Sequence, residues 1–199
     1  MPPSGASSRP IDTVFLDRDG VINRRIPGDY IKRPAEFEFL PGVVEALARL
    51  KTAGLRTVVI TNQRGIARGL FTPEALDRVH GFMQSQLAAR GARVDQIHFC
   101  PDLEGPRRKP APGMLLDARR DDPGIDFSRS VLIGDSASDI QAAAATGCPA
   151  ILVGTGAHLA EQRAKLDALG LKPACLARDL PDALDVWAPL AASLGAHAR

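Results

Sequence analysis

The sequence predicts an α/β fold, a parallel sheet flanked by helices, and two observations carry this prediction. Short runs of β-branched and apolar residues alternate along the chain with Ala, Leu and Arg stretches of helical period, a pattern typical of β-α units. The 199 residues are also enough to bury a substantial core. Strands are expected at 13–17, 55–61, 94–100, 130–135, 150–153 and 174–177. Helices are expected at about 42–53, 73–90, 112–120, 138–146, 158–169 and 182–193.

The individual elements follow from their residues. In chain order the strands read TVFLD, LRTVVIT, VDQIHFC, SVLIGD, AILV and ACLA, each a short apolar or β-branched run. Among the helices, the one at 73–90 has a clear start, because Thr72 can cap its first turn and Pro73 suits that turn. Residues 20–40 are too irregular for a helix and too long for a tight turn, and such loops are commonly functional.

Composition limits the domain organisation and the class of partner. Residues 1–10, rich in Pro, Gly and Ser, are expected to form a disordered tail, and residues 11–199 a single domain. A net charge of +2, from 25 basic and 23 acidic residues, provides no overall field for binding nucleic acid or a membrane surface. Three widely spaced cysteines favour a reducing compartment, and we expect no signal peptide and no membrane span. We therefore expect a cytoplasmic protein that is a monomer or a weak oligomer.

Polar side chains follow four of the expected strands, at the end where open parallel sheets bind ligands. They are Asp17 and Asp19 after the first strand, Thr61, Asn62 and Gln63 after the second, Arg107, Arg108 and Lys109 beyond the third, and Asp135 and Asp139 after the fourth. Side chains alternate along an extended backbone, so Asp17 and Asp19 can face one site while Arg18 points away. Two carboxylates this close repel each other, which is costly unless a cation or a reaction uses them.

These residue types together suit phosphoryl chemistry. Asp135 adds a third carboxylate to the pair, and an oxygen-rich cluster of this kind suits Mg²⁺. Lys109 supplies a compact positive charge and Thr61 a hydroxyl donor, both suited to a phosphoryl oxygen. A carboxylate can also attack phosphorus and form an aspartyl-phosphate. Each residue alone has an ordinary interpretation as a turn, cap or surface residue, and the case rests on their joint occurrence at matching strand ends.

Four segments occur in order as FLDRDGVIN, VVITNQ, RRKPAPGM and LIGDSASDI. With them the sequence resembles the haloacid dehalogenase superfamily of phosphatases. DRDGVIN, EFEFLPGVVEAL, TNQRGIARGLFT and RKPAPGM are similar to the branch that contains D-glycero-D-manno-heptose 1,7-bisphosphate phosphatases and histidinol-phosphatases. The resemblance covers about residues 11–156 and implies the Rossmann-like haloacid dehalogenase fold. The intervals between the first and second and between the second and third of the four motifs hold only a loop, a helix and a strand each, so no separate cap domain is expected.

The resemblance also implies a role for each site residue. Asp17 would be the nucleophile and Asp19 the general acid and base, while Thr61 and Lys109 would hold the transferring phosphoryl group. The ligands of Mg²⁺ would be the carboxylate of Asp17, the backbone carbonyl of Asp19, and Asp135. Asp139 would orient Lys109 or the metal shell. The positions where this branch contacts substrate are Asn62, Gln63 and Arg108.

Two departures from the branch matter. Its members commonly carry a zinc loop with two ligand pairs, but HFCPDLEGPRRKP contains only His98 and Cys100, so we expect strand residues here and no structural zinc. Arg64 stands where the branch usually has a small residue such as serine, and its guanidinium suits a second anionic group. Other basic residues in the segments expected to form the site's mouth are Arg24, Arg25, Lys32, Arg33, Arg68, Arg107 and Arg108. They predict a basic entrance and a substrate with more than one anionic group.

The leading hypothesis is a Mg²⁺-dependent phosphoric monoester hydrolase that removes the C7 phosphate of a heptose 1,7-bisphosphate. Its product would feed nucleotide-activated heptose for surface polysaccharide. Histidinol phosphate is the alternative substrate within the same enzyme class. A DNA 3′-phosphatase is disfavoured because the chain lacks the aromatic and basic stripes of a nucleic-acid groove. A catalytically silent module that binds a phosphorylated ligand is the hypothesis from a different class, and the full set of charged site residues argues against it.

Overall fold

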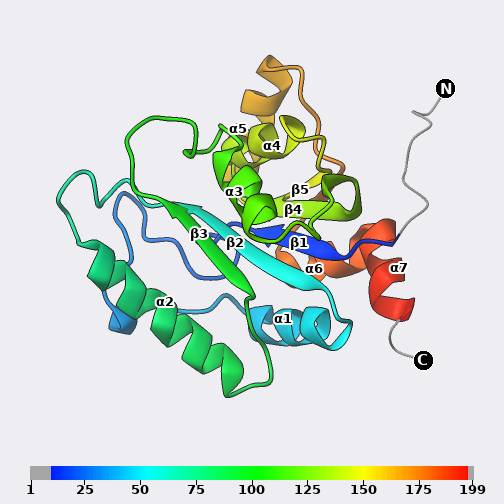
Figure 1. Ribbon diagram of the computed structural model, residues 1–199. Helices are drawn as coiled ribbons and strands as arrows, with labels where there is room; N and C mark the ends of the chain where they lie inside the picture. The colour runs from blue at the N-terminus through cyan, green and yellow to red at the C-terminus, as the bar shows by residue number, and fades with distance from the viewer. Residues whose placement is uncertain (1–9, 197–199) are drawn as a thin grey trace.

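The computed structural model describes residues 10–196, and its centre is a six-stranded sheet with the order β3-β2-β1-β4-β5-β6 (Figure 1). Each strand pairing in this sheet is parallel, which confirms the predicted fold class. The strands are β1 (Thr13–Leu16), β2 (Arg56–Asn62), β3 (Gln96–Cys100), β4 (Ser130–Gly134), β5 (Ala150–Val153) and β6 (Cys175–Ala177). The predicted tail at 1–10 lies outside the described residues except for Pro10, and a single domain over 11–199 stays a prediction.

Helices cover both faces of the sheet (Figure 1). The buried apolar residues of α1, α2, α6 and α7 form one cluster with the sheet, and those of α3, α4 and α5 form another on the opposite face. The helices are α1 (Val43–Thr52), α2 (Pro73–Ala88), α3 (Gly113–Asp121), α4 (Ala137–Ala144), α5 (Gly156–Ala168), α6 (Leu180–Val186) and α7 (Ala188–Ala196), with short 3₁₀ turns at Pro34–Glu36 and Phe127–Arg129. Within residues 10–196, no helix has the length and apolar character that crossing a membrane requires.

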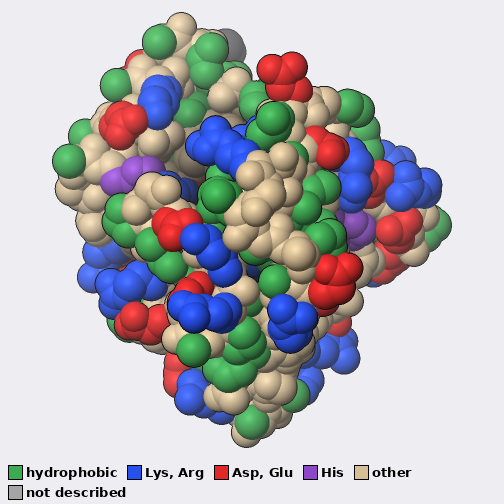
Figure 2. All heavy atoms as spheres, turned by 90° about the vertical axis from the view of Figure 1, so that its left-hand side faces the viewer, with side chains coloured by type: hydrophobic (Ala, Val, Ile, Leu, Met, Phe, Trp, Pro, Cys, Tyr) green, Lys and Arg blue, Asp and Glu red, His purple; other side chains and the backbone are tan. Residues whose placement is uncertain are grey.

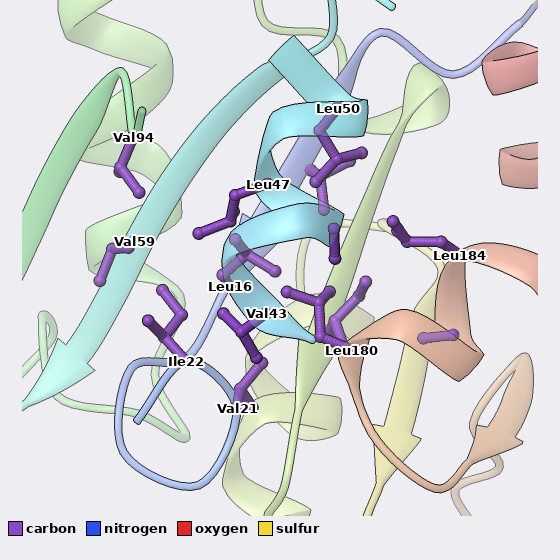
Figure 3. Packing of buried hydrophobic residues seen from close by; sticks show 14 of the residues in the cluster. Leu16, Val21, Ile22, Val43, Leu47, Leu50, Val59, Val94, Leu180 and Leu184 are labelled. Atoms are coloured by element: carbon purple, nitrogen blue, oxygen red, sulfur yellow. The ribbon is translucent and has the colours of Figure 1, made fainter. Parts of the chain in front are cut away.

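The core holds the central strands rigidly between the two helical layers. In β1 the side chain of Leu16 belongs to the cluster with α1, while Phe15 belongs to the cluster on the other face. Figure 3 shows Leu16 close to Leu47 of α1, and both side chains are fully buried. Burying a leucine stabilises the fold by about 1.5–3 kcal/mol, so the strand that Asp17 directly follows is anchored on both faces.

The predicted helix at 182–193 is wrong, because two helices occupy this segment. Trp187 has the extended dihedral angles φ −93 and ψ 104 and ends α6. Pro189 follows at the start of α7, where its missing N–H costs nothing because the first turn has no partner for it. The other predicted strands and helices agree with the structure to within two residues at each end.

The strand order creates a crevice at the centre of the sheet. From β1 the chain proceeds outward to β2 and β3, and then returns to place β4 on the other side of β1. In an open parallel sheet, ligands bind beyond the carboxyl ends of the strands at such a switch point. Asp17 and Asp19 leave β1 at this end, and Asp135 leaves β4 beside them.

Candidate active site

Three buried carboxylates meet at the switch point. Asp17, Asp135 and Asp139 each offer one oxygen, and these atoms lie within 4.8 Å of one another. Burial raises the pKa of Asp17 to about 7. The positive charge of Lys109 lowers this pKa, and repulsion from Asp139 and Asp135 raises it. Burial likewise raises the pKa of Asp135 to about 7. The cluster therefore needs positive charge before all its members can ionise at neutral pH.

Lys109 supplies part of that charge. Its Nζ lies 2.9 Å from Asp17 Oδ1 and 2.6 Å from Asp139 Oδ1, and it donates to the backbone oxygen of Ile60 at 2.9 Å. Burial would lower the pKa of Lys109, but the carboxylates of Asp139 and Asp17 outweigh it and raise the pKa. The amide of Asn62 holds the backbone of Lys109 in place, because Nδ2 donates to its oxygen at 2.9 Å and Oδ1 accepts from its N–H at 3.1 Å.

Arg25, from the loop after β1, contacts the remaining carboxylate. Its Nη2 lies 2.8 Å from both oxygens of Asp135 and 3.4 Å from the backbone oxygen of Asp19. The sequence indicated only that Arg25 lies near the mouth, and gave no sign of a partner 110 residues away.

The donor set fits Mg²⁺. Carboxylates of Asp17 and Asp135 beside the backbone carbonyl of Asp19 are hard oxygen ligands of the kind this cation takes. Asp139 is already paired with Lys109 and also caps α4, where its Oδ2 accepts from the Ser136 N–H at 3.0 Å. These two contacts hold Asp139 beside Lys109, and its role in orienting Lys109 or the metal shell stays a prediction from the resemblance.

Asp19 is held by donors from three directions. The Nη2 of Arg18 donates to both its oxygens at 2.9 and 2.8 Å, and the amides of Asn23 and Gln63 each donate to it at 2.9 Å. Burial would raise the pKa of Asp19, but Arg18 and these hydrogen bonds outweigh it and hold the pKa below its usual value. Arg18 does turn away from the pocket, but it is fully buried and folds back onto Asp19.

The predicted substrate contact at Gln63 needs correction. Gln63 is fully buried and does not line the pocket. Its Nε2 donates to both Asp19 Oδ2 and Thr61 Oγ1 at 2.9 Å, so it links two site residues instead of reaching the substrate. Sequence spacing placed Gln63 at the correct strand end, but it cannot tell which side chain after a strand turns inward.

A pocket of about 390 Å³ opens over these residues. Of the residues singled out from the sequence, its lining includes Asp17, Asp19, Arg25, Thr61, Asn62, Arg64, Arg68, Arg108 and Lys109. Arg64 is anchored at the mouth, where its Nε donates to the Tyr30 hydroxyl at 2.9 Å. The Tyr30 ring packs on Phe71, with ring centroids 5.6 Å apart. This contact joins the loop after β1 to the loop after β2.

The mouth is less basic than the sequence suggested. Four of the basic residues counted there are paired with acids outside the carboxylate cluster, in the pairs Arg24–Glu38, Lys32–Asp29, Arg33–Glu36 and Arg107–Asp117. Figure 2 views the side of the molecule that carries the long loops, and Lys and Arg side chains there lie among Asp and Glu. The positive charge facing the pocket comes from Arg25, Arg64, Arg68, Arg108 and Lys109.

Comparisons with known proteins agree with this geometry. The D-glycero-beta-D-manno-heptose-1,7-bisphosphate 7-phosphatase of Rhodopseudomonas palustris is 41% identical over 156 residues, which cover 73% of this chain and 84% of the relative. The chain belongs to this phosphatase family. A D-glycero-alpha-D-manno-heptose-1,7-bisphosphate 7-phosphatase from Mycobacterium bovis is 38% identical over 164 residues, or 78% of this chain and 86% of the relative. A family model described as HAD-hydrolase-like matches residues 106–183.

A solved structure extends the comparison to the site. The D,D-heptose 1,7-bisphosphate phosphatase of B. bronchiseptica, complexed with magnesium and phosphate, matches with a TM-score of 0.79 and 37% identity, covering 88% of this chain and 97% of that one. In the phosphatase described here, His98 and Cys100 lie in β3, as expected from the missing second ligand pair. Cys100 is buried, and His98 Nε2 lies 2.9 Å from Gln96 Oε1.

Gly20 is a site residue that the sequence reasoning missed. It has φ +97, and a Cβ built on it would lie 2.1 Å from Asp135 Oδ2. The position therefore needs glycine both for its backbone conformation and for the close approach of the carboxylate. A glycine directly after the aspartate pair was the available signal, but its meaning depends on where β4 ends.

Gly20→Ala is expected to lower the phosphatase's turnover by about 10²-fold or more, because the added methyl displaces Asp135 and strains the turn. Phosphate release and Mg²⁺ binding by calorimetry should both be impaired. Gly54→Ala is the matched control, since Gly54 also has positive φ, at +67, but a Cβ there meets nothing within 4 Å and the residue does not line the pocket. Equal effects of the two substitutions would show that backbone strain alone is responsible.

Proposed function

We propose that this enzyme is a Mg²⁺-dependent phosphatase that removes the C7 phosphate of D-glycero-D-manno-heptose 1,7-bisphosphate. The observation that carries the proposal is the pocket, which combines Asp17, Asp19, Thr61 and Lys109 with three arginines nearer its mouth. The names of the relatives support the substrate, and they include phosphatases of both the alpha and the beta anomer. The anomer is therefore a question for experiment.

In the proposed reaction, the carboxylate of Asp17 attacks the C7 phosphorus and the bond from phosphorus to the sugar oxygen breaks. The negative charge of the bound phosphate raises the pKa of Asp19 and favours its protonated form, which donates a proton to that oxygen as it leaves. Asp19 then takes a proton from water, which attacks the aspartyl-phosphate and releases inorganic phosphate and free Asp17. Lys109 and Thr61 hold the phosphoryl oxygens. Both residues line the pocket, and the Nζ of Lys109 lies 2.9 Å from Asp17 Oδ1, which supports this role.

The Mg²⁺ ion would be held by the carboxylates of Asp17 and Asp135 and by the backbone carbonyl of Asp19. When bound, it supplies positive charge that offsets the repulsion between a carboxylate nucleophile and an anionic phosphate. The magnesium and phosphate in the B. bronchiseptica structure support this assignment. The oxygen ligands and the raised pKa values of two of them support it independently.

The second phosphate of the substrate has its own proposed contacts. Arg64, Arg68 and Arg108 line the pocket together with the nucleophile. Guanidinium groups bind phosphate through charge-assisted hydrogen bonds, and three around one pocket suit a bisphosphate better than a monophosphate.

The proposal is tested by measuring phosphate release from β- and α-heptose 1,7-bisphosphate, histidinol phosphate, fructose 1,6-bisphosphate and a 3′-phosphorylated oligonucleotide. Each reaction is run with Mg²⁺ and with EDTA, and Asp17→Asn serves as the blank. We expect Mg²⁺-dependent release from one heptose bisphosphate well above all other substrates. Preference for histidinol phosphate would favour the sister activity, and no turnover of any substrate would favour a silent binding module.

Mg²⁺ is expected to raise the thermal unfolding temperature more at pH 8 than at pH 5.5. The pKa values of Asp17 and Asp135 are raised to about 7 in the folded metal-free protein, against an ordinary value of 3.8. Between these values the folded state holds protons that the unfolded chain has lost, so metal-free stability declines as the pH rises through about 7. Mg²⁺ binds the ionised carboxylates and offsets this loss. Equal shifts in unfolding temperature at both pH values would contradict the assignment of these ligands.

Arg64→Ser is expected to raise the KM for heptose 1,7-bisphosphate by about 3- to 10-fold, with kcat changed less than about twofold, because an exposed charge-assisted contact is lost. Heptose 7-phosphate, which lacks the second phosphate, should show no change in KM. Arg33→Ser is the matched control, since Arg33 pairs with Glu36 and does not line the pocket. A KM that rises equally for both substrates would show that Arg64 does not bind the second phosphate.

The cellular setting of the enzyme is part of the proposal. The three cysteines are free thiols, which accords with the expected cytoplasmic location. Monomer or weak oligomer, and no nucleic-acid or membrane partner, remain predictions from the sequence.

A further inference from the structure

A buried chain of side chains extends from Asp19 away from the pocket. The Nη2 of Arg18 contacts both oxygens of Asp19, and its Nη1 lies 3.1 Å from Nε2 of His80 in α2. Arg18 is fully buried and His80 is 7% exposed. Neither residue lines the pocket, so His80 contacts no substrate atom and is absent from the reaction described above.

The Arg18 contact fixes the state of His80. A guanidinium has only donors, so Nε2 of His80 must accept the hydrogen bond, and the imidazole is neutral with its proton on Nδ1. Burial, reinforced by the charge of Arg18, lowers the pKa of His80 to about 3, which agrees with this state. The only imidazole nitrogen without a hydrogen atom is thus used to hold Arg18.

The contact also limits the freedom of Arg18. A buried guanidinium N–H without a partner loses its hydration without compensation, so His80 disfavours any rotation of Arg18 that breaks this bond. The opposite edge of the same guanidinium makes the two-oxygen contact with Asp19. Because the group is planar and rigid, fixing one edge fixes the direction of the other.

We propose that His80 is a positioning residue of this phosphatase, which anchors Arg18 and thereby sets the orientation of the Asp19 carboxylate from outside the pocket. The inference rests on the proposed acid and base role of Asp19. Asn23 and Gln63 contact the same carboxylate from other directions, but only Arg18 contacts both of its oxygens. Loss of the His80 anchor therefore slows both proton transfers without changing the groups that bind phosphate.

Two amide substitutions test this role with little change in polarity. Glutamine places its oxygen near the position of Nε2, whereas asparagine is one methylene shorter and places its oxygen near that of Nδ1. His80→Asn is expected to lower kcat by about 10-fold with KM unchanged, because Asp19 is misaligned in the chemical steps. His80→Gln is expected to retain kcat within about threefold. Mg²⁺ affinity, measured by calorimetry without substrate, should stay at the wild-type value in both.

A control separates positioning from stability. Val79→Ala removes buried volume from the neighbouring position of the same helix, so it should lower the unfolding temperature while leaving kcat unchanged. The inference is overturned if His80→Asn keeps wild-type kcat, or if Asn and Gln lower kcat equally. A kcat of His80→Gln more than about threefold below wild type would also overturn the inference, even if His80→Asn folds poorly.

The same experiment distinguishes this inference from the proposed function. Asp19→Asn is assayed alongside the His80 variants. If Asp19→Asn turns over at the wild-type rate, the acid and base role of Asp19 fails, and the role of His80 fails with it. If Asp19→Asn is inactive while His80→Asn is fully active, only the positioning role of His80 is lost.

Discussion

Asp17→Asn is expected to abolish phosphate release, with kcat reduced by at least about 10³-fold, because an amide cannot attack phosphorus as a carboxylate does. The variant should keep its fold. The substitution preserves the shape of the side chain and removes one of three mutually repelling buried carboxylates, and Lys109 keeps its contact with Asp139. Phosphate release under saturating Mg²⁺ checks the loss of turnover, and thermal unfolding checks that the variant keeps its fold.

Asp12→Asn is the matched control for this loss. Asp12 precedes the opposite end of β1, where its carboxylate pairs with Arg129 outside the pocket. It should retain wild-type turnover. Release by Asp17→Asn above the level seen with EDTA would mean that a different group attacks phosphorus.

Lys109→Met is expected to lower both turnover and stability. The lysine is the cation between Asp17 and Asp139, with 2% of its side chain exposed. Removing one partner of a buried ion pair costs about 3–5 kcal/mol in the free energy of unfolding, because the remaining charges lose their counterion. Turnover should decline by about 10²- to 10³-fold as the charge on the phosphoryl oxygens loses its stabilisation. Urea unfolding and phosphate release provide the two measurements.

Lys165→Met controls for the loss of a lysine as such. Lys165 is exposed and pairs with Glu161 one helical turn away in α5, so both turnover and unfolding should stay close to wild type. Wild-type stability of Lys109→Met would contradict the prediction, since it would require the freed carboxylates to be accommodated without a counterion.

The sequence predicted the fold and the convergence of the site for the same physical reason. Parallel strands end at one edge of the sheet, so polar residues that follow different strands must meet there if the order of the strands brings those ends together. Asp17 and Asp135 illustrate this, because β1 and β4 are neighbours in the sheet although their last residues, Leu16 and Gly134, are 118 positions apart in the sequence. The apolar runs were long enough to identify the strands.

The contacts that orient the site could not be predicted in this way. The bond between Arg18 and His80 joins residues 62 apart and depends on which face α2 turns toward β1. The alternation of side chains along the strand correctly predicted that Arg18 points away from the pocket. It could not predict that the guanidinium of Arg18 contacts the carboxylate of Asp19. The inward turn of Gln63 depends in the same way on the path of a loop.

The location of the pocket arginines has a consequence for how this enzyme can diversify. Arg25, Arg64, Arg68 and Arg108 all lie on connections between strands and helices, whereas Asp17, the proposed nucleophile, directly follows a strand packed on both faces. Loops tolerate substitution far better than buried strands do. Related chains can therefore acquire a preference for a different phosphorylated sugar through changes in these loops, while inheriting the hydrolytic chemistry intact.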